Sequence, residues 1–302
     1  MVTEGIIEHN TIIKAKFAIE CVTFNEQIDF LATIDSNFIS FYAIGIFTME
    51  RTKVKAEGNI FLVEALNETD GRILFNDLLS QNTRTDFKNN DIVKSTDDLV
   101  FRRAISNAFP GNFTNNQFIA QFENVFYTAP ANIKNNNIIG SVNGVYGDTT
   151  NVKYNNFWKT QNYPKDSTNI SVDPMFVNDT SDFHLQMYSP LIDAGDPTIL
   201  DKDGSRSDIG LYGGPYGEKY TYRDLAPKPP SNLTAIMDSG LVKLTWNKNT
   251  EADFSVYRVY RDTVPDFMYD TTKIIAVLSD TVFFDDPPQK FISGNYLSLI
   301  HI

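Results

Sequence analysis

The segment DKDGSRSD places three carboxylates within eight residues, the densest group of potential metal ligands in the chain. Asp201, Asp203 and Asp208, together with backbone carbonyls, could offer Ca²⁺ the oxygen ligands that it requires. A second interpretation stays open, because Asp203 and Gly204 form an ordinary turn pair, and Asp208 could cap backbone amides or pair with Arg206. The segment therefore indicates either a calcium site or a tightly bonded turn.

Two charged pairs, Asp97 with Asp98 and Arg102 with Arg103, are the candidates for catalysis. A basic and an acidic pair could meet there on adjacent strands, where such side chains could act in acid–base catalysis. The alternative is a solvated ion pair at a turn, which is common on protein surfaces. The catalytic residues therefore stay unknown, and the enzyme question stays open at this point.

Three aromatic residues, Tyr154, Phe157 and Trp158, form a cluster that could bind sugars. Exposed aromatic rings stack on the apolar faces of sugar rings. Alternation along a strand directs at least one of the three into the core, and packing there is the alternative role.

Composition excludes several function classes. The 302 residues carry 26 Lys and Arg against 38 Asp and Glu, a formal net charge of −12, which disfavours binding to nucleic acid or to anionic membranes. One Cys and three His are too few for a thiolate or imidazole zinc site, and we expect no Cys/His nucleophile. No run of about 18 apolar residues occurs, so we expect no membrane insertion.

Asparagine makes up about a tenth of the chain, and it recurs in a repeated pattern. In each repeat, an Asn is followed after one residue by β-branched or aromatic residues, at intervals of 19 to 31 residues. Short apolar runs between Asn, Gly, Asp and Thr are typical of strands, and a variable period suits a solenoid whose turns differ in length. Asn tolerates left-handed backbone at a bend, and its amide can bond to the same Asn one coil away. The repeated residues are Asn10, Asn37, Asn59, Asn90, Asn116, Asn136 and Asn155.

The stretch from residue 150 to 215 resembles the terminal coils of right-handed parallel β-helix proteins of the pectate-lyase-like superfamily. That resemblance implies a parallel β-helix over residues 1–224, but little about chemistry, since the superfamily contains lyases, hydrolases, epimerases and adhesins. The matching positions are Asp173, Pro174, Phe176, Asp182, Phe183, His184, Leu185, Ser189, Pro190, Asp193, Gly195, Asp201, Asp203, Gly204, Arg206, Asp208, Ile209, Gly210, Tyr212 and Gly213.

A second unit follows the Pro-rich linker 225–230. Residues 231–302 resemble a fibronectin type III module, with Trp246 as its expected core aromatic. The expected last strand of the module is missing, and residue 1 falls inside a repeat, so we expect a fragment that lacks N-terminal coils and a signal peptide. The predicted fold class is all-β, a parallel β-helix followed by a partial immunoglobulin-like sandwich.

The resemblance implies a secreted or cell-surface protein, of the kind found in bacteria. We expect a monomeric, non-catalytic scaffold that binds glycans, adheres or has a structural role. The alternative is a polysaccharide lyase or glycoside hydrolase acting on acidic polysaccharide, which would need a carboxylate cluster and an Arg or Lys together in one groove. Extracellular polysaccharide or a cell-surface glycan is the expected partner, and Ca²⁺ the one cofactor considered.

Overall fold

The computed structural model is almost entirely β and divides into two compact units. It describes residues 2–22, 29–49, 52–63, 73–78, 85–88, 90–94, 100–107, 111–119, 121–128, 131–262, 270–286 and 297–301. The first unit comprises Met1–Pro174 and Pro190–Thr221, and the second comprises Met175–Ser189 and Tyr222–Ile302. The prediction of a parallel β-solenoid followed by antiparallel sheets is confirmed.

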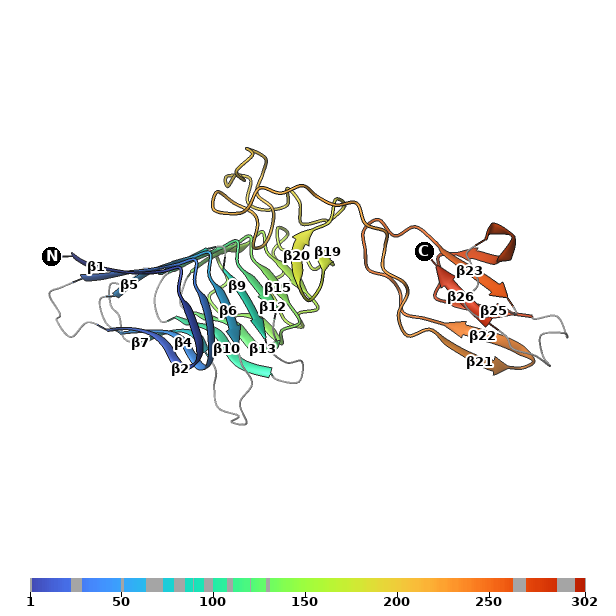
Figure 1. Ribbon diagram of the computed structural model, residues 1–302, viewed down its shortest axis with the longest axis horizontal. Helices are drawn as coiled ribbons and strands as arrows, with labels where there is room; N and C mark the ends of the chain where they lie inside the picture. Colours follow the sequence, from blue (N-terminus) through green and yellow to red (C-terminus); the bar gives the residue numbers. More distant parts are fainter. Residues whose placement is uncertain are drawn as a thin grey trace. The chain divides into compact units, whose positions relative to one another are not determined.

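The first unit is a solenoid in which successive coils pair in parallel, from blue to green in Figure 1. One face of the solenoid is a seven-stranded sheet in which each strand pairs with the corresponding strand of the next coil. Its strands are β1 (Val2–Glu8), β3 (Asp29–Asp35), β5 (Thr52–Glu57), β8 (Thr85–Lys88), β11 (Gly111–Thr114), β14 (Asn132–Lys134) and β17 (Val152–Lys153).

The second sheet has eleven strands and begins as one long strand per coil. The long strands β2 (Thr11–Val22) and β4 (Phe38–Met49) pair with each other, and β4 then pairs with two shorter strands of the following coil. Later coils are therefore three-sided. One of the two short series is β6 (Ile60–Val63), β9 (Asp91–Lys94), β12 (Gln117–Ile119), β15 (Asn137–Ile139) and β18 (Asn156–Trp158); the other is β7 (Ile73–Leu78), β10 (Val100–Asn107), β13 (Gln121–Thr128) and β16 (Asn143–Gly147).

The core of the solenoid consists of apolar columns that run from coil to coil. In-register parallel pairing places like residues above one another, as with Phe118, Ile138 and Phe157. Within one coil, a ring from each side meets at the centre. Phe126 packs edge-on against Phe113 at 5.3 Å and against Phe118 at 5.2 Å between ring centroids. The β-branched and aromatic residues of the repeats thus fill a continuous interior.

The second unit contains one short hairpin and two antiparallel sheets. The hairpin joins β19 (Phe176–Asn178) to β20 (Asp182–Leu185). One sheet has the order β21 (Thr234–Asp238), β22 (Leu241–Thr245), β25 (Val282–Asp285), and the other has the order β24 (Ile274–Leu278), β23 (Tyr257–Asp262), β26 (Leu297–His301). A single turn of 3-10 helix, η1 (Thr271–Lys273), precedes β24. Val242, Leu244, Trp246, Tyr257 and Val259 form the core, so Trp246 lies where the sequence predicts.

Candidate functional site

Each coil turns sharply from the first sheet into the second through two residues. The first of the two has a positive φ in every corner that the structure describes up to Tyr154. The second is one of the repeated Asn residues. The left-handed residue is therefore the neighbour of the repeated Asn, and not the Asn itself as the sequence suggested. These left-handed residues are His9 (φ 54°), Ser36 (53°), Gly58 (63°), Asn115 (55°), Asn135 (55°) and Tyr154 (58°).

All seven repeated Asn residues stand in one column, which we call the asparagine ladder. From Asn37 onward, the side-chain oxygen of each accepts hydrogen bonds from the backbone N–H and from the amide of the Asn one coil earlier. Asn169 extends the ladder to an eighth member, only 14 residues after Asn155. The N to Oδ1 distances are 2.9 Å (Asn10 to Asn37), 3.0 Å (Asn37 to Asn59), 3.0 Å (Asn59 to Asn90), 3.0 Å (Asn90 to Asn116), 3.0 Å (Asn116 to Asn136), 2.9 Å (Asn136 to Asn155) and 3.0 Å (Asn155 to Asn169).

The ladder also donates to backbone carbonyls beside the corner. The amide of Asn136 donates to the carbonyls of Phe113 and Lys134, both at 2.9 Å, and to Oδ1 of Asn155 at 3.0 Å. Asn136 has no exposed surface. Because buried backbone groups must be paired, these side chains are part of the fold rather than a binding surface.

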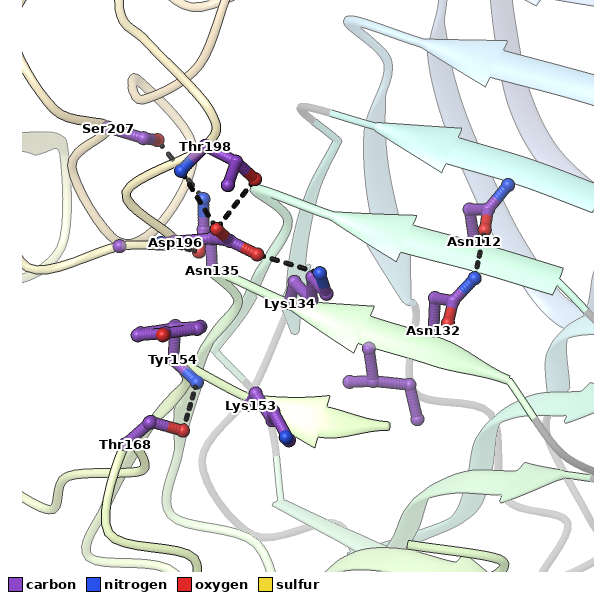
Figure 2. A network of polar contacts seen from close by, with 12 residues as sticks. Asn112, Asn132, Lys134, Asn135, Lys153, Tyr154, Thr168, Asp196, Thr198 and Ser207 are labelled. Carbon is purple, nitrogen blue, oxygen red and sulfur yellow. Dashed lines mark hydrogen bonds and ion pairs between the residues drawn. The ribbon is translucent and has the colours of Figure 1, made fainter. Parts of the chain in front are cut away.

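Residues Pro190–Thr221, which we call the strap, bind the outside of this corner (Figure 2). Asn135 accepts from the N–H of Asp196 at 2.7 Å through its side chain and from the N–H of Gly210 at 2.8 Å through its carbonyl. Lys134 Nζ lies 2.7 Å from Asp196 Oδ2. A Cβ on Gly195 would lie 2.9 Å from the Asn135 amide and 2.6 Å from the Ser207 carbonyl. The strap therefore needs glycine where its backbone lies directly on the corner.

The three carboxylates of the predicted calcium loop point to separate backbone partners. Asp201 accepts from the N–H groups of Asp208 and Gly214, while Asp208 accepts from the N–H of Asp193 at 2.9 Å. Burial raises the pKa of Asp201 against the opposing effect of its N–H donors. The hydroxyl and N–H of Ser205 lower the pKa of the exposed Asp203. Throughout the described chain, no three His, Cys, Asp or Glu side chains converge closely enough to hold a metal ion.

The candidate charged pairs are described only in part. Asp97 and Asp98 lie outside the described residues, and for Arg102 only the backbone position in β10 is described. Arg103 is half-buried, and its guanidinium carbon lies 3.7 Å from the centroid of the Tyr127 ring. The guanidinium of Arg103 therefore makes a favourable cation–π contact with the ring of Tyr127.

The aromatic cluster does not form one platform. Phe157 is completely buried and stacks on Tyr163 at 5.0 Å, because strand alternation in β18 directs it into the core. Trp158 is half-buried, with Lys159 Nζ 5.5 Å from its ring centroid. Tyr154 lies at the corner, 5.8 Å from the Arg206 guanidinium. The three rings therefore lie apart, with Phe157 in the core and the other two partly exposed at separate places.

A stack of side chains on the outer surface of the second sheet was not found from the sequence. Tyr127 on β13 and Tyr146 on β16 stand opposite each other, and their rings stack with centroids 5.0 Å apart and planes 4° from parallel. They are 37% and 58% exposed. Together with Arg103 they form a three-membered column, the Arg–Tyr–Tyr stack. Both Tyr residues stand at nearly the same distance after a ladder Asn, but a spacing that occurs only twice does not reveal a column without the register of the strands.

The hairpin of the second unit contains a His–carboxylate pair. His184 Nδ1 lies 2.6 Å from Asp182 Oδ1, and this hydrogen bond lowers the pKa of Asp182. Both residues are partly exposed, and Asp182 also accepts from the His184 backbone N–H at 3.2 Å. This is a local contact within β20, whereas the turn of the hairpin is bonded by Asn178, which accepts from the N–H groups of Thr180 and Ser181.

Comparisons with family models, curated proteins and solved structures found no match to the chain. Among the described residues, no helix has the length and apolar character needed to cross a membrane.

Proposed function

We propose that the chain is a stiff, non-catalytic scaffold of an extracellular or cell-surface protein, which displays glycan-binding side chains on the outside of its solenoid. The asparagine ladder carries this proposal. It joins successive coils from Asn10 to Asn169 through side-chain amides that are buried from Asn37 to Asn155, so each coil is fixed in register with the next. A solenoid of this kind presents outward side chains in straight columns along a long face.

The chemistry of the described residues supports binding over catalysis. The carboxylates of the strap bond to backbone N–H groups, which leaves Asp201 and Asp208 committed to the fold. A lyase or hydrolase needs convergent carboxylates with a base or acid beside them, whereas the one described cation of the candidate pairs, Arg103, lies against a ring.

The two proposed families agree with the arrangement of strands. Three-sided coils with an amide ladder at one corner support membership of the pectate-lyase-like superfamily. In the second unit, the first, second and fifth strands of the sandwich form one sheet and the third, fourth and sixth form the other. This distribution, around the Trp246 core, is typical of immunoglobulin-like sandwiches and supports the fibronectin type III proposal.

Electrophoresis of the full chain through gels containing neutral or acidic polysaccharides tests the proposal. We expect retarded migration in at least one glycan, with no new reducing ends and no absorbance from unsaturated sugars after long incubation. Release of product would show that the chain is a lyase or hydrolase. Migration unchanged by any glycan would overturn the glycan-binding part.

A further inference from the structure

We propose that the exposed ring of Tyr146, at the end of the Arg–Tyr–Tyr stack, binds a neutral sugar ring. The proposal rests on the proposed function, and it names both the site and the class of sugar. The stack lies on β10, β13 and β16, three consecutive strands of the second sheet.

The order of the strands determines which ring face is available. Arg103 on β10 covers the face of Tyr127 that is turned toward it, and Tyr146 on β16 covers the opposite face. β16 is the last strand in this order, and the next coil pairs with it only at Asn143, three residues before Tyr146, so no described strand pairs with Tyr146 on its second side. Within the described part of the chain, Tyr127 is the one ring or cation that contacts Tyr146, and 58% of Tyr146 is exposed.

Such a face suits a flat partner of limited size. A pyranose ring presents an apolar C–H face that stacks on an aromatic ring much as Tyr127 does. Arg103 and Tyr127 hold Tyr146 in place from behind, so little side-chain entropy would be lost on binding.

Hydrogen-bonding groups stand further along the same strand. Asn143 accepts from the amide of Asn162 at 3.0 Å and donates to the carbonyl of Glu123 at 2.9 Å. The backbone position of Asn143 is about 10 Å from that of Tyr146, at 3.3 Å per residue. This exposed amide pair would contact the hydroxyl groups of a second sugar unit.

The surrounding charge favours a neutral sugar over an acidic one. Glu123 is exposed on β13, and Asp148 follows β16 directly. The hydroxyl and N–H of Thr150 lower the pKa of Asp148, so it is ionised at neutral pH. The chain as a whole carries −12, and an anionic polysaccharide would be repelled.

Calorimetric titration of the full chain with neutral hexasaccharides of glucose, mannose and xylose, and with oligogalacturonate, tests this site. We expect a neutral hexasaccharide to bind, and Tyr146→Leu to weaken it at least about tenfold. Tyr146→Phe keeps the ring and should bind within about threefold of the unchanged chain. Tyr188→Leu, at a residue that is 52% exposed in the second unit, is the matched control and should not alter binding.

The outcomes separate the site from the proposed function. Equal binding by the unchanged chain and Tyr146→Leu would overturn the site but leave glycan binding in place. Binding of oligogalacturonate alone would overturn the neutral class. No binding of any sugar would overturn the site and the glycan-binding function together. Thermal unfolding of Tyr146→Leu is the check on folding. If the Arg–Tyr–Tyr stack only joins coils, this substitution would lower the stability of the chain without changing its affinity for sugar.

Discussion

The two units of the chain differ in the kinds of side chain that fill their interiors. The solenoid buries a continuous column of amides beside its apolar columns, with Asn90, Asn116, Asn136 and Asn155 at no measurable exposure. The sandwich core is apolar and aromatic, and its bonded polar groups, such as the Arg261–Asp285 pair at 2.7 Å, stand beside it. Each coil of a solenoid pairs with the coil before it and the coil after it, so its register depends on contacts with those neighbours. Buried amides specify that register, because a shift of one coil along the next would leave an amide without a hydrogen-bond partner. A sandwich closes on itself and can rely on apolar packing.

Replacement of a ladder residue is the strongest test of this contrast. Asn136→Ala would remove the oxygen that accepts from the N–H and amide of Asn116, and it would remove one donor from each of the carbonyls of Phe113 and Lys134. Because each buried unpaired group costs about 1–3 kcal/mol, we expect a loss of about 4 kcal/mol in the unfolding free energy of the solenoid. The chain contains two Trp residues, one in each unit, so fluorescence of Trp158 in a Trp246→Phe background measures the solenoid separately.

Asn132→Ala is the matched control for the ladder. Its amide bonds to Asn112 at 2.8 Å on the exposed surface of the first sheet (Figure 2), so we expect a change within about 0.5 kcal/mol. Equal losses for the two substitutions would mean that burial of the ladder has no special role.

The second test removes apolar volume from the sandwich. Leu244 is completely buried beside Trp246, and Leu244→Ala should lower the unfolding free energy of the second unit by about 3 kcal/mol. Fluorescence of Trp246 in a Trp158→Phe background follows this unit. The transition of the solenoid, followed by Trp158 in the Trp246→Phe background, should stay in place. A joint shift of both transitions would contradict separate cores.

How far the sequence predicts these features depends on whether they repeat. The ladder is predicted because one Asn per coil recurs with apolar partners, whereas Asn169 escapes because its coil is shorter and lacks the intervening residue. Tyr127 and Tyr146 repeat only once, so no column is evident without the register of the strands. The role of Asp201 depends on N–H groups of Asp208 and Gly214, which only the folded strap brings to it.

The strap allows a test through pH. Burial by itself would raise the pKa of Asp196, but the Lys134 ammonium and the donors of Thr198 outweigh burial and hold that pKa below its usual value. Stability from such a carboxylate is present above its unfolded pKa of about 4 and is lost as the pH falls through the lower folded value. Asp196→Asn should therefore cost the solenoid about 2 kcal/mol at neutral pH, and the difference should shrink below about pH 4.

Urea unfolding of the two chains from neutral to acid pH measures that difference. Asp203→Asn is the control, because Asp203 is exposed and bonds only within its own turn, so we expect a smaller change. A difference that stays constant across the pH range would contradict a role for the ionised carboxylate.

The smallest expected effect concerns the backbone of the corner itself. Tyr154 adopts a left-handed conformation that Asn115 and Asn135 adopt at the same place in earlier coils, and a bulky side chain pays about 1 kcal/mol more than Asn there. Tyr154→Asn should therefore stabilise the solenoid by about 1 kcal/mol, since the contact of Tyr154 with Arg206 at 5.8 Å is weak.

Gly58→Ala is the reverse case, because it adds a side chain to a left-handed residue of the corner. An added Cβ meets only ordinary contacts at 3.5 Å and 3.6 Å, so its cost of about 1 kcal/mol would be the backbone term alone. If both substitutions destabilise the solenoid, the ring of Tyr154 stabilises its corner by more than its backbone costs, and amides would not be the preferred material there.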